Sequence, residues 1–291
     1  MQTLSHNIED YPEGLVLPID KPYRWTSADV IRKIKWAACR HFKNKKLKVG
    51  HAGTLDPLAT GILLVCIGKA TKRADELQRS PKQYIAGVSF GATTASYDLE
   101  KEVLDHPIDT ADAFSRQRLS REQLEAVLPR FIGEQEQIAP LFSAKSVDGV
   151  RVYEMARKLY KEGKSLENSD ILQSSRISIY DLQVLEWTDT VPLLEPEAPL
   201  GLKYGKRLCC SSTGDDRNKI NVASTEGMVL PTALLQVDCS KGCYIRALAR
   251  DLGEALESAA FLSSLRRTRN GGYDISQAIS MDDALQMLAA D

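Results

Sequence analysis

Apolar and polar residues near the start of the chain predict a strand followed by a helix. Apolar side chains alternate with other residues over 14–20, as they do in a half-buried strand. Either Thr26 or Ser27 can cap the next element, because apolar residues then recur at helical spacing up to Ala38. The basic residues of this segment lie off the apolar stripe, so the helix should present a basic side.

The same patterns predict further elements of both kinds. We expect strands over residues 82–90, 174–187 and 231–239. We expect helices after a capping box at Ser120 and Gln123, over 152–160, over 248–256 and after Ser280. The sequence has no internal repeat and no regular βαβ alternation, which favours an α+β fold.

Residues 188–228 differ from the rest of the chain. They are rich in Pro, Gly, Ser, Thr and Asp, and their apolar residues follow no sustained period. Such a segment buries too little apolar surface to offset the entropy lost on ordering it. We therefore interpret most of this segment as a mobile insertion.

Charge is concentrated in one segment. The chain of 291 residues has 38 basic and 39 acidic residues, so net charge alone indicates no nucleic-acid partner. Residues 21–48, however, contain ten Lys or Arg and one acid, a surplus of +9 within 28 residues. Such a surplus attracts phosphates and steers their approach. The alternative is an ordinary solvated helix face and loop.

The cysteines, the first ten residues and the apolar runs argue against a metal-binding, secreted or membrane protein. The six cysteines form no CxxC pair, and only four histidines are present, so we expect no metal site. The first ten residues lack a signal-peptide pattern, and no apolar run is long enough to span a membrane. We expect a cytoplasmic protein with reduced, structural thiols and no membrane association.

One carboxylate stands out as a candidate for chemistry. Residues 51–61 read His-Ala-Gly-Thr-Leu-Asp-Pro-Leu-Ala-Thr-Gly, which places Asp56 between two glycines and directly before Pro57. An Asp-Pro pair is common where a helix starts, with Asp as N-cap, and also in turns. A fixed carboxylate close to a basic segment also suits acid, base or nucleophilic chemistry on a polyanion.

A second candidate element lies late in the chain. Residues 239–246 read Cys-Ser-Lys-Gly-Cys-Tyr-Ile-Arg, and Tyr244 and Arg246 would share a face if this segment were extended. Arg246 is permanently charged and could hold Asp56 ionised through a bidentate contact. The alternative is an ordinary surface arginine at a strand end.

Together these segments resemble the TruB family of bacterial tRNA pseudouridine-55 synthases. Residues 50–61 strongly resemble the catalytic motif of that family. Further segments resemble its other motifs in order, namely residues 20–22, 68–72, 82–84, 239–246 and 265–267. Residues 137–140, 143–145 and 152–154 resemble its RNA-clamping thumb. The resemblance extends from about residue 14 to residue 274.

The resemblance implies a fold and a reaction. The fold would be the pseudouridine-synthase α+β domain, a mixed and largely antiparallel sheet with flanking helices and a central cleft that holds Asp56. The enzyme would isomerise uridine-55 in the T loop of tRNA, breaking the N1–C1′ bond and forming a C5–C1′ bond, without a metal or cofactor. The target base must be flipped out of the RNA. Asp56 would either attack C1′ as a nucleophile or remove the C2′ proton.

The resemblance also implies roles for residues that would form the uracil pocket. Tyr84 would stack on the flipped uracil. Arg246 would pair with Asp56, and Tyr244 would either hydrogen-bond in the pocket or assist proton loss at C5. Leu265 would line the uracil pocket.

Other residues would contact the rest of the RNA. His51 would fill the space left by the flipped base. Lys21 and Lys72 would either contact phosphate or support the active-site loop. The basic loop, which we define as Lys43, Lys45 and Lys46, would bind RNA phosphates.

The chain departs from the family pattern in three ways. The 188–228 insertion is longer than the connection we would expect, Ala52 stands where Thr is frequent, and we expect no C-terminal PUA domain. Residues 1–291 would then form a single catalytic domain, with a thumb over 133–163. We expect a monomer with the T arm of tRNA as its partner.

Three other functions fit the sequence less well than a tRNA pseudouridine synthase. The first is a non-catalytic RNA-binding or RNA-folding module. The second is a guide-RNA-dependent synthase of the dyskerin type, which the missing PUA-like tail disfavours. The third is a carboxylate hydrolase that uses Asp56 alone, for which the sequence offers no second acid at a recognisable spacing.

Overall fold

The computed structural model describes residues 4–105, 119–140, 146–147, 150–151, 174–192, 220, 222–225 and 228–289. These residues belong to two compact units. The first unit, called the N-terminal unit here, includes residues 4–85 and 264–289. The second, called the central unit, includes residues 86–105, 119–140, 174–192 and 222–263. The helix predicted over residues 152–160 lies outside the described residues.

The strands form a mixed sheet, as predicted. Its order is β1-β3-β12-β4-β11-β10-β7, with β2 beside β3 and β13 beside β12. The bounds are β1 Leu15–Lys21, β2 Val49–Ala52, β3 Ala59–Ile67, β4 Lys82–Phe90, β7 Gly133–Ile138, β10 Ser174–Pro192, β11 Val229–Cys239, β12 Ala260–Asn270 and β13 Tyr273–Asp274. The β1–β3, β2–β3, β10–β11 and β7–β10 pairs are antiparallel, whereas β3 and β12 run parallel.

The described residues also form helices and short strands beside the main sheet. The prediction of an α+β fold is therefore confirmed. The α-helices are α1 Ser27–His41, α2 Ala74–Arg79, α4 Arg121–Val127, α6 Ile245–Ala255 and α7 Met281–Met287. The 3-10 turns are η1 Ile8–Asp10, η2 Gly68–Arg73, η3 Leu128–Phe131 and η5 Ile275–Gln277. Two small ribbons pair β5 Ala92–Thr94 with β6 Val103–Asp105, and β8 Ser146–Val147 with β9 Val150–Arg151.

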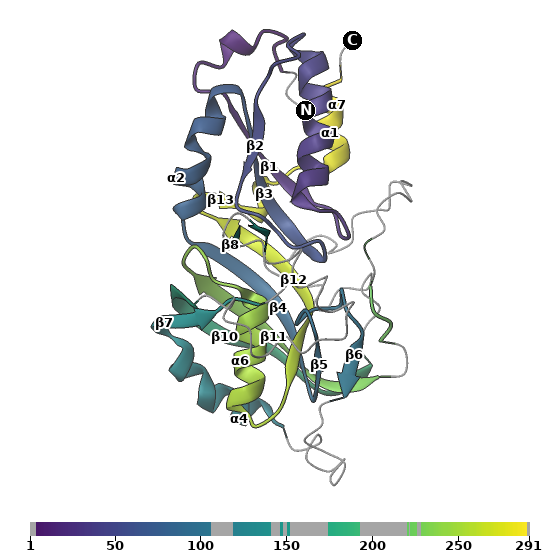
Figure 1. The fold of residues 1–291 in the computed structure, drawn as a ribbon, viewed down its shortest axis with the longest axis vertical. Helices are drawn as coiled ribbons and strands as arrows, with labels where there is room; N and C mark the ends of the chain where they lie inside the picture. The colour runs from purple at the N-terminus through teal and green to yellow at the C-terminus, as the bar shows by residue number, and fades with distance from the viewer. Residues whose placement is uncertain are drawn as a thin grey trace. The chain divides into compact units, whose positions relative to one another are not determined.

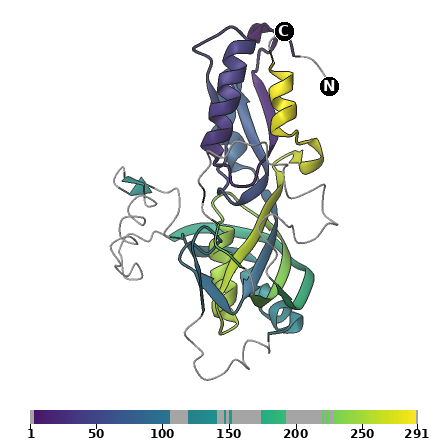
Figure 2. The same ribbon diagram turned by 90° about the vertical axis from the view of Figure 1, so that its right-hand side faces the viewer.

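In the N-terminal unit, α1 forms where its apolar stripe predicted it. Thr26 is the N-cap, and its side chain and that of Asp29 form a reciprocal capping box. Val30, Ile34 and Ala38 are fully buried, and α1 packs beside α7 (Figure 1). Figure 2 shows α1 in violet-blue and α7 in yellow beside the strands of this unit.

Strand β3 is the centre of this unit, because all nine of its residues are buried. Ile62, Leu64 and Cys66 belong to a buried apolar cluster, and Leu77 of α2 packs against it. Gly61 is required where β3 meets β12. Its φ is +94°, and an added Cβ would lie 2.2 Å from the Arg267 carbonyl oxygen. A larger residue at Gly61 would therefore separate the two strands.

The central unit contains the other predicted elements. The capping box at Ser120 and Gln123 is present and starts α4, but the helix becomes a 3-10 turn at Leu128. Pro129 explains the change, because proline has no N–H to continue the α-helical pattern. Helix α6 packs against α4 and buries most of its residues.

Of the two local alternatives for Asp56, the turn is confirmed and the helix cap is not, and the extended conformation considered for residues 244–246 is wrong. Asp56 does not cap a helix, because residues 56–59 form a turn, closed by the Ala59 N–H and the Asp56 carbonyl at 3.1 Å, that leads into β3. The neighbouring apolar residues favour the strand because β3 is buried on both faces. Tyr244 and Arg246 do not lie in extended chain, because Tyr244 is the N-cap of α6 and Arg246 lies in its first turn.

The predicted insertion over 188–228 is also too long at both ends. Strand β10 continues to Pro192 and pairs with β11, which begins at Val229. Ala223 and Thr225 are buried, and the Ala223 N–H donates to the Leu99 carbonyl at 2.7 Å. Backbone pairing therefore orders residues whose own sequence has no apolar period. Residues 193–219 lie outside the described residues.

Candidate active site

Asp56 lies half-buried in the turn between β2 and β3. The residue before it is fixed by the first residue of α1. The Ser27 hydroxyl donates to the Leu55 carbonyl at 3.1 Å and accepts from the Leu55 N–H at 3.0 Å. A single buried hydroxyl thus satisfies both backbone groups of Leu55, which holds the turn against the start of α1.

Lys21 supports the other side of the turn. This last residue of β1 is fully buried. Its Nζ donates to the carbonyls of Pro22 at 2.9 Å, Trp25 at 2.5 Å and Pro57 at 3.0 Å. Burying an ammonium group is costly unless such contacts compensate it. The arrangement fixes the residue directly after Asp56, in accord with the supporting alternative considered for Lys21.

Arg267 of β12 holds the approach to the same turn. It is 1% exposed. Its Nε donates to the Ile62 carbonyl at 2.7 Å, Nη2 to Gly53 at 3.0 Å and Nη1 to Thr54 at 3.4 Å. Two buried cations, Lys21 and Arg267, therefore bind the backbone on either side of Asp56. From the sequence, Arg267 was expected only as part of the motif over residues 265–267.

A buried ion pair fixes the beginning of β3. The Nη2 atom of Arg266 lies 2.8 Å from Oδ2 of Asp20. Oδ1 of Asp20 accepts from Nη1 of Arg266 at 3.2 Å and from the Gly61 N–H at 3.1 Å. This bidentate contact joins β1, β3 and β12 a few residues beyond Asp56.

Three predicted pocket residues lie in the same unit. His51 on β2 is half-buried. Burial, and then the charge of Arg267, lower the pKa of His51 below its ordinary value, so its ring is neutral at pH 7. Leu265 on β12 is half-buried and pairs in parallel register with Ala59, three residues after Asp56. Tyr84 on β4 is 8% exposed.

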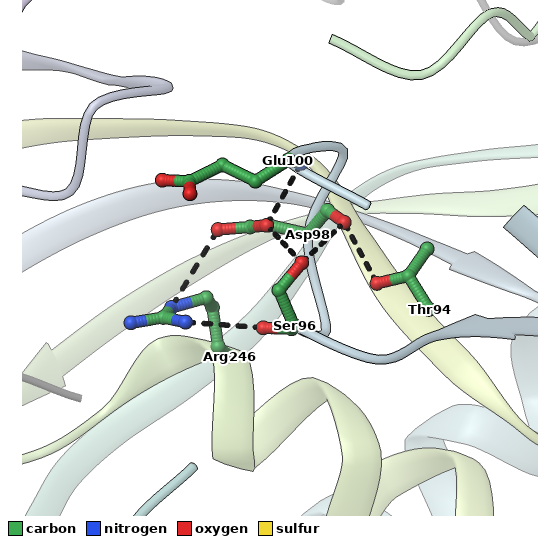
Figure 3. Close-up of polar contacts among 5 residues, drawn as sticks. All are labelled: Thr94, Ser96, Asp98, Glu100 and Arg246. Atoms are coloured by element: carbon green, nitrogen blue, oxygen red, sulfur yellow. Dashed lines mark hydrogen bonds and ion pairs between the residues drawn. The ribbon is translucent and has the colours of Figure 1, made fainter. Parts of the chain in front are cut away.

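In the central unit, Arg246 is a buried arginine rather than a surface one. The exposed fractions of the Arg246 and Asp98 side chains are 4% and 7%, and Nε of Arg246 lies 3.7 Å from Oδ2 of Asp98. Nη1 of Arg246 donates to the Ser96 carbonyl at 3.1 Å. Figure 3 shows the guanidinium directed at the loop that carries both residues.

Asp98 is itself fixed by its loop. Its Oδ1 accepts from the Ser96 hydroxyl at 2.6 Å and from the Glu100 N–H at 3.0 Å. The Thr94 hydroxyl donates to the Asp98 carbonyl at 2.7 Å (Figure 3). Short polar side chains commonly bind nearby backbone groups in this way. The acid that faces Arg246 is therefore held in one position.

Tyr244 is positioned by Gln137 of β7. The Gln137 side chain donates to the Tyr244 carbonyl at 3.2 Å and accepts from its N–H at 2.8 Å. Gln137 is buried, and Tyr244 is half-buried at the start of α6. Gln137 belongs to the segment assigned to the thumb, yet here it serves as an edge-strand residue that fixes the N-cap of α6.

The predicted RNA-contacting lysines are on the surface. Lys43, Lys45 and Lys46 follow α1, and all three side chains are exposed. Lys43 has a φ of +49°, a left-handed conformation that turns the chain out of the helix. Lys72, in η2, is also exposed. Exposed lysines are compatible with phosphate contacts, which stay a prediction.

The thiols near these residues are neutral. Burial raises the pKa of Cys66 to about 11. A hydrogen bond with Cys239, together with burial, raises the pKa of Cys243 well above its ordinary value. Both thiols are thus protonated near pH 7, which is not the state of a reactive cysteine. In the described ranges, no three His, Cys, Asp or Glu residues gather as metal ligands.

The structure brings together some of the predicted residues but leaves one pairing open. Asp56, His51 and Leu265 belong to the N-terminal unit, and Arg246 and Tyr244 belong to the central unit. The Asp56–Arg246 pair and the central cleft therefore stay predictions. Over the described stretches, no helix combines the length and apolarity needed to cross a membrane.

Sequence reasoning missed several supporting residues. Ser27, Asp98, Gln137, Arg266 and Arg267 act on backbone or charged partners far away in sequence. For Arg266 and Arg267 the sequence held a signal. Adjacent residues of a strand point to opposite faces of the sheet, so one of the two arginines must lie on the inner face if the other faces solvent. For Asp98 the only hint was a short run of small polar residues after a strand.

Two protein-family models match this chain, one before and one after residue 200. Residues 40–198 match the TruB family pseudouridylate synthase N-terminal domain, and residues 246–291 match the tRNA pseudouridylate synthase B C-terminal domain. The two matches together include every residue of the Asp56 turn and nearly all of α6.

Curated relatives extend the match over nearly the whole chain. The tRNA pseudouridine synthase B of Phocaeicola vulgatus is 42% identical over 94% of this chain and 92% of its own length. The protein of the same name from Bacteroides fragilis is 41% identical over 93% of this chain and 92% of its own length. That from Thermus thermophilus is 38% identical over 91% of this chain and 75% of its own.

Solved structures agree on the fold. A chain in a Cbf5-Nop10-Gar1 complex is 22% identical with a TM-score of 0.56, over 96% of this chain and 56% of that one. A chain of an H/ACA RNP bound to a substrate RNA containing 2′-deoxyuridine is 20% identical with a TM-score of 0.55. The match covers 98% of this chain and 57% of that one. The protein thus spans little more than half of these structural neighbours. By its sequence, the chain belongs to the TruB family of pseudouridylate synthases.

Proposed function

We propose that the protein is a tRNA pseudouridine synthase that isomerises uridine-55 in the T loop, with Asp56 as its catalytic carboxylate. The observation that carries this proposal is the support of the Asp56 turn. Ser27 binds the residue before Asp56, Lys21 binds the residue after it, and Arg267 binds Gly53 and Thr54. A reacting group gains rate when its geometry is fixed before the substrate arrives.

The proposed reaction needs a carboxylate that acts twice. The N1–C1′ bond breaks, the uracil turns while bound, and a C5–C1′ bond forms, after which C5 loses its proton and N1 gains one. Asp56 attacks C1′ and later leaves, or it removes the C2′ proton and returns it. Atoms and electrons balance within the nucleotide, so the scheme calls for no metal or redox cofactor.

The remaining residues receive roles that fit their positions. Tyr84 stacks on the flipped uracil, and Leu265, beside the start of β3, lines the pocket. His51, neutral at pH 7, can occupy an apolar base stack without bringing in a charge. In the proposal Arg246 pairs with Asp56, and Tyr244 hydrogen-bonds in the pocket or assists loss of the C5 proton.

The partner and setting follow from the same proposal. The T arm of tRNA is the substrate, with the basic loop and Lys72 near its phosphates. Lys21, buried among carbonyls, is assigned to loop support rather than phosphate binding. The enzyme would act as a monomer in the cytoplasm, as a single catalytic domain with a thumb over 133–163.

The rival functions account for less of the molecule. A non-catalytic RNA-binding module has no need of two buried cations around one carboxylate turn. The likeness to the Cbf5 chain is at 22% identity, whereas relatives at about 40% carry the name tRNA pseudouridine synthase B. A guide-dependent enzyme is therefore the less favoured reading.

The direct test uses purified protein, a bare tRNA transcript and no other RNA. Pseudouridine is mapped by carbodiimide treatment and primer extension. The proposal expects one new modification, at the T-loop uridine, and none in a matched transcript with cytidine at that position. An unmodified T loop in a transcript that binds tightly would support a binding module. Product that appears only after a guide RNA is added would support the dyskerin type.

A further inference from the structure

The outward face of α1 carries a feature that loop support and catalysis do not explain. Arg32, Trp36 and Arg40 recur at every fourth residue of α1, and Lys35 follows Arg32 by three residues, so these four side chains share a face. This stripe lies opposite the buried one that packs into the N-terminal unit. Lys43 follows the end of the helix by two residues. With Cys39, Lys43 and Lys45 the stripe lines an open hollow of about 600 Å³.

Trp36 lies among the cations of this hollow and is 62% exposed. The other two tryptophans are half-buried, and Trp187 packs against Phe90 with ring centroids 5.9 Å apart. The guanidinium of Arg40 lies 4.8 Å from the Trp36 ring centroid. Because most of the indole is still in contact with water, the hollow offers a planar surface with an adjacent cation.

The charge around Trp36 determines which partner fits. Five cations surround the hollow, and Asp29 neutralises one of them through its 2.8 Å contact with Arg32. A partner for this surface needs both negative charge and a flat ring. An acidic peptide supplies the charge without the ring, and duplex RNA hides its rings inside the helix. An unpaired nucleotide supplies both.

We propose that this hollow binds an unpaired nucleotide of RNA, with its base stacked on Trp36 and its flanking phosphates on Lys35, Lys43 and Lys45. Aromatic platforms with cations beside them bind single-stranded nucleic acid in this way. The inference rests on the proposed function in that the RNA is taken to be the tRNA substrate. It adds a stacking contact to the phosphate contacts expected of the basic loop.

The bound nucleotide is not the one that reacts. Ser27, at the start of α1, contacts Leu55 beside Asp56, and Trp36 is nine residues farther along the helix. A rise of 1.5 Å per residue places Trp36 about 14 Å along the axis from that contact. Two different nucleotides of one RNA would therefore occupy the two places, so that the hollow contributes to affinity rather than to chemistry.

The test measures the affinity of a fluorescently labelled octauridylate for the full chain. Trp36→Ala should weaken binding by roughly 10- to 100-fold, the loss expected for one stacked base. Trp36→Tyr keeps a ring and should stay within about threefold of the parent, because a phenol ring still stacks on a base. Tyr180→Ala, which removes a side chain that is 55% exposed in the central unit, is the matched control and should change nothing.

Tryptophan fluorescence shows whether Trp36 itself stacks. Octauridylate should quench the parent protein more than it quenches Trp36→Tyr. Equal quenching in the two proteins would overturn the proposal, as would unchanged affinity in Trp36→Ala. An octaglutamate peptide that binds as tightly as octauridylate would overturn it too, because the surface would then select charge alone. Pseudouridine formation is assayed separately, so loss of catalysis without loss of octauridylate binding would count against Asp56 and not against the hollow.

Discussion

The Asp56 turn and the Arg246 region fix a charged group by different means. At Asp56 the neighbouring backbone is held, through Ser27, Lys21 and Arg267. At Arg246 the charged head itself is held, by the Asp98 carboxylate and the Ser96 carbonyl. Asp56 is half-buried, whereas Arg246 is 4% exposed.

The difference indicates a difference in task. A group that attacks or accepts a proton must approach its substrate, so its support has to come through the backbone and leave the carboxylate accessible. A group that tunes a neighbour's charge works best when it is desolvated and bound to fixed partners. We infer that Asp56 meets the substrate and that Arg246 supplies a fixed positive charge.

After the loss of the Asp56 carboxylate itself, the largest expected effect comes from changing Arg246. Arg246→Lys keeps the charge but loses the planar fork, and it should lower kcat by about 100-fold or more with little change in tRNA affinity, because a small misplacement at a reacting centre is costly. Single-turnover rates and filter binding measure the two effects. Equal losses in rate and affinity would assign Arg246 to binding instead.

The partner of Arg246 sharpens that test. Asp98→Asn preserves shape and removes the charge, and it should cost roughly tenfold in kcat, because loss of one charge-assisted contact is smaller than loss of the guanidinium fork. If the two residues act as a unit, the double variant should be little slower than Arg246→Lys alone. Fully additive effects would show that Asp98 does not act through Arg246.

The next effect breaks the support of the Asp56 turn. Arg267→Met removes the donors to three backbone carbonyls and should lower stability by about 2 kcal/mol, because buried acceptors are left unpaired. It should also lower kcat by roughly tenfold with an unchanged KM. Arg269→Met, exposed on the same strand, is the control and should leave both values nearly unchanged. A loss of stability without any loss of kcat would make Arg267 structural only.

A smaller effect concerns affinity alone. Replacing Lys43, Lys45 and Lys46 together with Gln should weaken tRNA binding by about tenfold at low salt. It should also reduce the slope of log affinity against log salt by about 2, since fewer counterions are released. Arg130→Gln, an exposed cation in η3, is the control. An unaltered salt slope would place the basic loop away from RNA.

The smallest effect is the pH dependence of stability at His51. Burial and the nearby Arg267 lower the pKa of His51 in the folded state. As the pH falls below about 6.5, His51 therefore takes up a proton in the unfolded protein before it does so in the folded protein. The free energy of unfolding then decreases with falling pH until the pKa of His51 in the folded state is reached. The His51→Asn variant should lose less stability than the parent between pH 7 and pH 5. Parallel denaturation curves for the two proteins over this range would contradict the assignment.

The sequence predicted what depends on local pattern. Thr26, one of the two expected caps, starts α1, and Ser120 and Ser280 cap α4 and α7 as predicted. Asp56 was identified because it lies in a short, dense motif. These features are encoded within a few residues, where propensity and periodicity are informative.

What the sequence did not predict depends on contacts between distant residues. The Arg267 contacts with Gly53 join positions more than 200 residues apart, and Asp98 meets Arg246 across 148 positions in the chain. Strand β2 was missed because it gains order only by pairing with β3. The end of β10 was missed because pairing with β11 overrides its own irregular pattern.

The most direct test of the central claim compares Asp56→Asn with the parent enzyme on one unmodified tRNA transcript. Asparagine keeps the size of the side chain and the turn, but it neither ionises nor serves as a comparable nucleophile. The account predicts that pseudouridine at the T-loop uridine falls by at least about 10⁴-fold in rate while tRNA affinity stays within a few-fold. Pseudouridine formed by Asp56→Asn at a rate near that of the parent would contradict it.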